Sequence, residues 1–157
     1  MKIELLKRFC DQEKGEICSA PFVAGGNTYA TNRRIAIRLK GKVPGVMDGE
    51  RFKKNVDVVF AYAPSKEGAV FQPIPQPVCQ KCKDEGFVTC KECGHKTQCD
   101  CRPREFSDIG NRRLATQYLA LLRLLPGVKI APNCGGEYDP MWFEFADGDG
   151  LLMPMKK

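Results

Sequence analysis

Residues 17–39, ICSAPFVAGGNTYATNRRIAIRL, carry the pattern that decides the fold class. The stretch from Ile17 to Ala24 is rich in strand-forming residues, and Gly25-Gly26-Asn27 is a turn signal, so we expect extended structure to resume at Thr28–Thr31. Residues 35–39 then alternate with a period of two, which predicts a third strand. The first part of the chain is therefore expected to form an antiparallel sheet.

Two helices are expected, one in each half of the chain. Residues 3–14 place apolar side chains at helical spacing with charges opposite, and Gly15 is expected to end that helix. Thr116 is expected to be the N-cap of a second helix over Gln117–Leu125. The residues of this helix available for the core are Leu119, Leu122 and Leu125.

The remaining segments complete an α+β pattern. Residues 50–62 fit a short helix or a strand, and prolines make 64–78 a stiff segment unsuited to a central strand or a helix interior. Strands are expected at 106–115, 128–130, 141–145 and 151–155, with turns at 133–138 and 147–150. This order predicts two helix-plus-antiparallel-strand halves, residues 1–72 and 105–157, flanking an inserted zinc-knuckle or ribbon module at 73–104.

Composition places the chain among globular proteins. Hydrophobic residues make up 43% of 157 residues, and no apolar run approaches the roughly 20 residues that span a bilayer. The charged N-terminal stretch is unlike a signal peptide, so we expect a cytoplasmic protein in a reducing compartment and no membrane partner. The net charge of +6 is compatible with an anionic partner but adds little to that hypothesis.

Six of the nine cysteines fall within 23 residues as close pairs. Disulfide frameworks belong to secreted proteins, whereas a Cys-x2-Cys turn offers two sulfurs to one tetrahedral zinc ion. The sequence therefore predicts a structural zinc site whose candidate ligands are Cys79, Cys82, Cys90, Cys93, Cys99 and Cys101.

The number of metal ions is open. With His95 there are seven candidate ligands, and two closed sites would need eight, a bridging sulfur or an oxygen ligand such as Asp100. The first choice is a single site made by the first two Cys-x2-Cys pairs, Cys79 to Cys93. In a nested alternative, Cys99 and Cys101 complete the site with Cys79 and Cys82.

Other uses of these cysteines are less well supported. A redox Cys-x2-Cys lacks thioredoxin-like surroundings, an iron–sulfur cluster usually has other spacings, and a catalytic zinc usually needs more than one histidine. The stretch CKDEGFVTCKEC at 82–93 resembles the zinc module of J-domain chaperones, which implies zinc binding only. Cys10, Cys18 and Cys134 lie apart and are expected to be small core or surface residues.

Three further stretches resemble the bacterial DNA sliding clamp, the ring that tethers a polymerase to duplex DNA. They are GGNTYATNRRIA at 25–36, LATQYLALL at 114–122 and GLLMPMK at 150–156, and they occur in the clamp order. A clamp subunit strings three such domains together, whereas this chain has one. The first stretch is one residue shorter than its clamp counterpart and lacks its Gly and His, and clamps have no cysteine module.

The resemblance implies two kinds of site. In clamps an apolar pocket accepts short peptides, and the matching positions here are Thr31, Arg34, Ile35, Met153, Pro154 and Met155. Basic residues lining such a ring would meet DNA phosphates without reading sequence. The candidates for that contact are Lys7, Arg8, Arg112, Arg113 and Arg123.

The leading hypothesis is a non-enzymatic, clamp-like accessory protein of DNA replication or repair, with structural zinc. Its partners would be double-stranded DNA, replication or repair proteins, or both, and a single-domain ring would require a homo-oligomer. Such a reduced clamp would suit a phage or mobile element. The alternative is a zinc-dependent protein–protein adaptor that keeps the fold without encircling DNA. No Ser-His-Asp set, phosphate-binding glycine loop or paired-carboxylate motif supports an enzyme.

Overall fold

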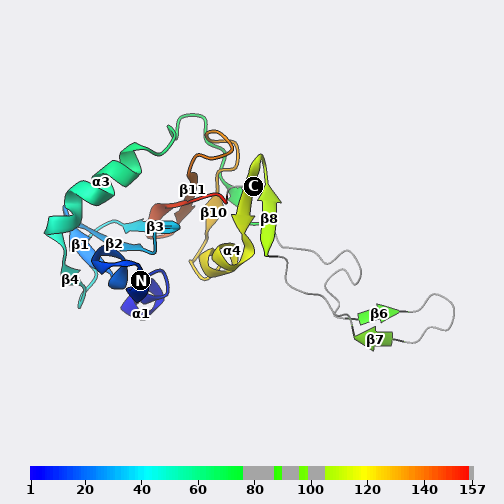
Figure 1. The fold of residues 1–157 in the computed structure, drawn as a ribbon, viewed down its shortest axis with the longest axis horizontal. Helices are drawn as coiled ribbons and strands as arrows, with labels where there is room; N and C mark the ends of the chain where they lie inside the picture. Colours follow the sequence, from blue (N-terminus) through cyan, green and yellow to red (C-terminus); the bar gives the residue numbers. More distant parts are fainter. Residues whose placement is uncertain (76–86, 90–95, 99–104, 156–157) are drawn as a thin grey trace.

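The computed structural model describes residues 1–75, 87–89, 96–98 and 105–155. Its main feature is an eight-stranded sheet in the order β4-β1-β2-β3-β12-β11-β10-β5 (Figure 1). Neighbouring strands are antiparallel except β1 and β4, which are parallel. The strands are β1 Phe22–Ala24, β2 Asn27–Thr31, β3 Ile35–Leu39, β4 Met47–Asp48, β5 Gln72–Pro73, β10 Lys129–Ile130, β11 Met141–Phe145 and β12 Gly148–Leu152.

Short helices cover both faces of this sheet, which confirms the expected α+β class. Figure 1 shows α1 and α4 on one side of the strands and α3 on the other. The helices are α1 Ile3–Lys7, α2 Glu16–Ser19, α3 Lys53–Ala61 and α4 Thr116–Leu122, with 3-10 turns η1 Gln12–Lys14 and η2 Glu50–Phe52. The segment whose type the sequence left open is thus helical.

Alternation along the strands divides the core in two, because successive side chains point to opposite faces. Ile35, Ile37 and Leu39 of β3 join the large cluster under α1 and α4, whereas Ala36 faces the α3 side. α1 and α4 contribute Leu6, Leu119 and Leu122 to the large cluster, and Phe9 and Leu125 join it from just beyond the two helix ends. All five are at most 2% exposed. The burial expected of Leu119, Leu122 and Leu125 is confirmed, but the second helix ends at Leu122 and not at Leu125.

Strand β12 joins the two halves of the sheet, since it pairs with β3 on one side and β11 on the other. The turn expected at 147–150 is confirmed only at Asp147, because β12 already begins at Gly148. A Cβ on Gly150 would lie 2.3 Å from the carbonyl oxygen of Ala36 and 2.3 Å from the Phe143 ring. These glycines allow close approach of neighbouring strands rather than marking a turn.

The expected helix over 3–14 is interrupted. α1 ends at Lys7, and Asp11 then accepts a hydrogen bond from the backbone N–H of Glu13 at 3.1 Å to cap η1. Gly15, at φ 98°, lies between η1 and α2. Ile17 consequently lies in α2 rather than in a strand, and extended structure begins only at Phe22.

The strand expected over 106–115 is a hairpin, β8 Phe106–Ile109 and β9 Arg112–Ala115. Gly110 occupies its two-residue turn at φ 61°, the left-handed region that such turns require. Thr116 is the first residue of α4 and not its N-cap. Its hydroxyl lies 3.1 Å from that of Ser107.

The inserted segment begins later than expected. β5 pairs with β10, and Ile74 is 8% exposed within the large core cluster, so residues up to Pro75 belong with the main sheet. Beyond it, β6 Phe87–Thr89 and β7 Lys96–Gln98 form an antiparallel hairpin that pairs Phe87 with Gln98. The expected proline-rich segment meets the sheet only at its edge, where proline is tolerated.

Among the residues that the structure describes, no helix has the length and apolar character that crossing a membrane requires.

Candidate functional site

The six candidate zinc ligands, Cys79 to Cys101, lie outside the described residues, and so do His95 and Asp100. Within the described ranges, no group of three or more potential ligands gathers to hold a metal ion. What the structure does give is the β6–β7 hairpin. By chain connectivity, Cys90 and Cys93 belong to the link between its strands, whereas Cys99 follows its second strand.

The three separate cysteines are free thiols. Cys18 and Cys134 are buried, as expected of small core residues, and Cys134 Sγ donates a hydrogen bond to the carbonyl oxygen of Ser65. Burial raises the pKa of Cys10 to about 11, so this thiol stays protonated at neutral pH. These cysteines therefore have the character of packing residues rather than of metal ligands.

The structure brings together the two stretches expected to form a peptide pocket. Met153 donates its backbone N–H to the carbonyl oxygen of Arg34 at 2.8 Å. The turn before β3 is held by Asn32, whose Oδ1 accepts from the N–H groups of Arg34 at 3.0 Å and Ile35 at 2.9 Å. Thr31 donates its hydroxyl hydrogen to the carbonyl oxygen of Ile35 at 2.8 Å.

The side chains of these candidates differ in their access to solvent. Ile35 is 1% exposed and belongs to the core, so its expected contact with a peptide is wrong for this structure. Pro154 is also buried, Met153 and Met155 are half-buried, and Arg34 is exposed. The exposed residue that sequence reasoning missed is Arg33, which has φ 69° and is the sole non-glycine residue with positive φ among those described.

The candidate DNA-binding residues do not form one uniform surface. Lys7 and Arg8 are exposed at the end of α1, and Lys7 pairs with Glu4 at 2.9 Å. Arg113 pairs with Asp108 at 3.0 Å. Arg123, at the end of α4, donates to the carbonyl oxygen of Pro75 at 2.5 Å. Of the five candidates, only Lys7 and Arg8 are exposed.

The expectation that Arg112 contacts DNA is wrong, because its side chain is 1% exposed. Its guanidinium donates to three carbonyl oxygens, those of Asp139 at 3.0 Å, Pro132 at 2.9 Å and Cys134. Burial lowers the pKa of Arg112 from its ordinary value. The side chain fastens the loop before β11 to β9, and its burial keeps it out of reach of a phosphate. Arg112 and Arg113 are adjacent in the sequence, and nothing in the sequence indicated that Arg112 is the buried one.

A polar cluster on the α3 side of the sheet was also missed. Asp149 accepts from Arg38 at 2.9 and 2.8 Å and from Lys66 at 2.5 Å. Burial raises the pKa of Asp149, but the hydrogen bonds from Arg38 and Lys66 outweigh it and hold the pKa below its usual value. Lys66 also lies 3.9 Å from the centre of the Trp142 ring. The one signal in the sequence was Arg38 amid apolar strand residues.

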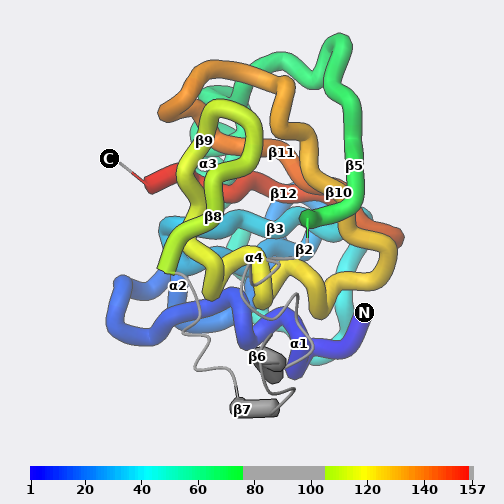
Figure 2. The backbone as a smooth tube through the Cα atoms, turned by 90° about the vertical axis from the view of Figure 1, so that its right-hand side faces the viewer, coloured from blue at the N-terminus to red at the C-terminus, as the bar shows by residue number. Residues whose placement is uncertain are grey.

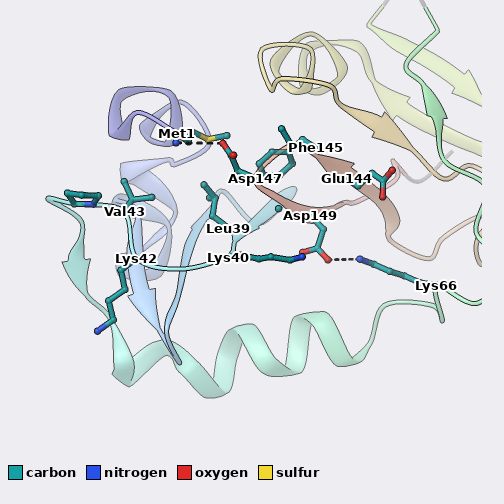
Figure 3. A pocket seen from close by; sticks show the side chains of 13 residues that line it. Met1, Leu39, Lys40, Lys42, Val43, Lys66, Glu144, Phe145, Asp147 and Asp149 are labelled. Atoms are coloured by element: carbon teal, nitrogen blue, oxygen red, sulfur yellow. Dashed lines mark hydrogen bonds and ion pairs between the residues drawn. The ribbon is translucent and has the colours of Figure 1, made fainter.

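Next to this cluster is an open cavity of about 620 Å³ (Figure 3). It lies between the loop after β3 and the turn joining β11 to β12. Asp147, in that turn, lies 3.6 Å from the amino group of Met1. The principal lining residues are Leu39, Lys40, Lys42, Lys66, Phe145 and Asp149.

Comparison with protein-family models, curated proteins and solved structures gave no match for this chain.

Proposed function

We propose that this protein is a non-enzymatic, clamp-like accessory protein of DNA replication or repair. One observation carries the proposal: α1 followed by β1–β3 is repeated as α4 followed by β10–β12, and β3 pairs with β12 to join the two sets into one sheet. Both helices lie on the same face of that sheet (Figure 2). In a clamp, helices on one face of the sheet line the ring and meet DNA; in this chain the opposite face of the sheet is covered by α3.

The C-terminal contact supports the same proposal. Besides the Met153 bond to Arg34, the N–H of Met155 donates to the carbonyl oxygen of Arg113 at 2.8 Å. The 153–155 segment therefore connects the main sheet to the β8–β9 hairpin. Half-buried methionines beside an exposed arginine suit contact with a partner peptide, because methionine adapts to irregular apolar surfaces.

We also propose that the inserted segment binds one structural zinc ion. The support is the spacing of the cysteines, which form close pairs within the segment that also contains the β6–β7 hairpin. Both arrangements raised by the sequence use Cys79 and Cys82.

A zinc-dependent adaptor that does not encircle DNA is the second candidate. The contacts of the basic residues favour it, since Arg112 is buried while Arg113 and Arg123 are engaged within the protein. Arg112 is withdrawn from the surface and Arg113 is paired with Asp108, so both contribute less positive charge to a DNA-facing surface. The adaptor would use the inserted segment and the 153–155 segment as partner surfaces.

Duplex DNA binding as a function of salt separates the two candidates. We expect the wild type to bind duplex DNA weakly and without sequence preference. In K7E/R8E the plot of log binding constant against log salt concentration should be shallower, because each phosphate contact removed lowers its slope by about 0.9. K54E changes an exposed lysine of α3 on the opposite face and is the matched control. Binding that is absent, or equally affected by both variants, would favour the adaptor.

Solution mass tests whether a ring forms. Six copies of the 17.6 kDa chain would weigh about 106 kDa, the value expected if single domains replace the six of a clamp ring. A monomer or dimer in light scattering would exclude encirclement by the protein alone.

A further inference from the structure

Two of the free thiols, Cys10 and Cys18, lie close together near the start of the chain. The backbone N–H of Asp11 donates to the carbonyl oxygen of Cys18 at 2.7 Å. Standard backbone dimensions then place the Cα atoms of Cys10 and Cys18 roughly 4–7 Å apart. Disulfides usually join Cα atoms about 4.4–6.8 Å apart, so the backbone already has the separation that a bond between these two cysteines needs.

The two thiol groups are neighbours as well. Burial raises the pKa of Cys10 to about 11, a hydrogen bond from the backbone of Thr31 lowers it, and the charge of the Cys18 thiol raises it further. Because the effect of one charge on another decreases with distance, this influence requires the two sulfur atoms to be near each other. Cys10 Sγ otherwise donates to the carbonyl oxygen of Leu6 at 3.8 Å, a weak bond that costs little to break.

The residues between these cysteines already form a closed turn. Asp11 caps η1, and Gly15 connects η1 to α2. The N–H of Cys18 donates to the carbonyl oxygen of Gly15 at 2.9 Å, which holds Cys18 in the short helix. A bond between Cys10 and Cys18 would therefore close a loop that the backbone forms without it.

Cys134 is a third free thiol in a different place. It belongs to the cluster with Trp142 and Leu151 on the α3 side of the sheet, whereas Cys10 packs against the large cluster on the other side. The Cys134 thiol donates to the carbonyl oxygen of Ser65. The sheet separates Cys134 from the other two thiols, so it serves as an internal control.

We propose that Cys10 and Cys18 form a disulfide when the protein meets a peroxide. Cys10 reacts first, because it is half-buried whereas Cys18 is 0% exposed. The Cys10 thiolate attacks one oxygen of hydrogen peroxide and becomes a sulfenic acid, and the hydroxide released takes up the proton that Cys10 lost. The Cys18 sulfur then attacks the sulfenic sulfur, and the oxygen leaves as water with the Cys18 proton. Two electrons pass from the two thiols to the peroxide, which ends as two waters.

The disulfide would fix the segment 10–18 beside the end of β2. Its backbone contact, Thr31, begins the turn to Ile35, and Arg34 in that turn accepts the N–H of Met153. Because the Cys10 thiol is protonated at neutral pH, the reaction should be slow and the pair should stay reduced until peroxide accumulates. The proposal is independent of zinc and of DNA binding.

Peptide mapping of the full chain tests the site. Trypsin cleaves after Arg8, Lys14 and Arg33, so Cys10 falls in peptide 9–14 and Cys18 in peptide 15–33, each with a single cysteine. After treatment with hydrogen peroxide, the remaining thiols are alkylated and the protein is digested without reduction. We expect these two peptides to be joined, with a mass two hydrogens below their sum, and Cys134 to be alkylated.

Single variants and thermal unfolding provide the controls. C134S should form the joined peptides to the same extent as the wild type, whereas C10S should form none. C10S is preferred to C18S because Cys10 is half-buried and its replacement is expected to leave the fold intact. The oxidised wild type should melt at a higher temperature than the reduced protein, since the bond restricts the unfolded chain, and dithiothreitol should reverse the shift. Peroxide should produce no such shift in C10S.

Three results would overturn the proposal. The first is alkylation of both Cys10 and Cys18 after peroxide treatment, which would show that the thiols do not react with each other. The second is Cys10 joined to a cysteine of the inserted segment instead of Cys18. The third is a joined protein that melts no higher than the reduced one, which would show that the bond does not fit the loop as folded.

Discussion

Arg38 and Asp149 face each other directly across the β3–β12 pairing, with two hydrogen bonds of 2.9 and 2.8 Å, although 111 residues separate them in the chain. The Asp149 side chain is 17% exposed and also binds Lys66, which comes from the loop after α3. One carboxylate thus joins both halves of the sheet to the segment that covers its outer face.

Replacing this carboxylate should therefore weaken the whole domain. We expect D149N to lower the free energy of unfolding by about 1–3 kcal/mol, because two cationic partners lose their acceptor in a partly buried place. Urea denaturation followed by Trp142 fluorescence measures the change. D57N removes an exposed ion pair with Lys53 on α3 and should change stability much less. Equal effects of the two variants would contradict the role given to Asp149.

The lowered pKa of Asp149 also predicts how the stability of the protein depends on pH. Since the folded pKa of Asp149 is lowered, its contribution is fully present above the unfolded value of about 3.9 and is lost as pH falls through the folded pKa. Wild-type stability should therefore decrease below about pH 4 more steeply than that of D149N. Parallel pH profiles for the two proteins would show that other carboxylates control acid unfolding.

Arg112 is expected to stabilise the fold rather than to bind DNA. We expect R112A to lower the free energy of unfolding by about 3 kcal/mol or more, because three carbonyl oxygens lose their donor and a large buried side chain is removed. Thermal unfolding of R112A and R113A gives the comparison, since Arg113 is a neighbouring arginine with an exposed ion pair. A stable R112A that had lost DNA binding would reverse this assignment.

Gly150 should tolerate no side chain. A methyl group there would meet a backbone carbonyl of β3 and the ring of Phe143, so G150A is expected to lower the melting temperature by about 6 °C or more. G136A is the matched control, because its added Cβ would meet nothing closer than 3.3 Å. Calorimetry that found equal melting temperatures would show that β12 can shift away from its neighbours.

Zinc removal should affect the inserted segment and spare the main sheet. Trp142 is 5% exposed and donates to the carbonyl oxygen of Pro64, entirely within the main sheet and its covering loop. A chelator is therefore expected to remove stoichiometric zinc without changing the fluorescence of Trp142. C79S/C82S should lose the metal, while one of C90S/C93S and C99S/C101S retains it. If the wild-type protein contains no zinc after purification under reducing conditions, the metal proposal is contradicted.

Part of the fold could be predicted from period-two alternation, as in β3, where every second side chain is buried in the large core cluster. The helix over 3–14 failed because helical spacing does not reveal that Asp11 can cap a new turn. The strand at Gly148 failed because glycine signals a turn as readily as a close contact between strands. These outcomes depend on tertiary neighbours that a local pattern does not contain.

For the candidate site, the structure brings the 153–155 segment beside Arg34, whereas the peptide pocket that the resemblance implies stays a prediction. Sequence reasoning could not tell that Arg112 rather than Arg113 is buried, because the packing of β9 against the loop before β11 decides which of its faces is covered. It also missed the cavity, whose lining comes from segments far apart in the chain, such as Lys42 and Asp149. Charge that gathers only on folding has no signature in the linear sequence.

The central place of β12 also has a consequence for biosynthesis. Strands β1, β2 and β3 leave the ribosome early, but the neighbour that β3 requires follows more than a hundred residues later. Until then β3 has an open edge, which is prone to pairing with other chains. Closure of so long a loop favours slow folding after synthesis. Slower translation or chaperones that protect the nascent edge should therefore raise the yield of folded protein.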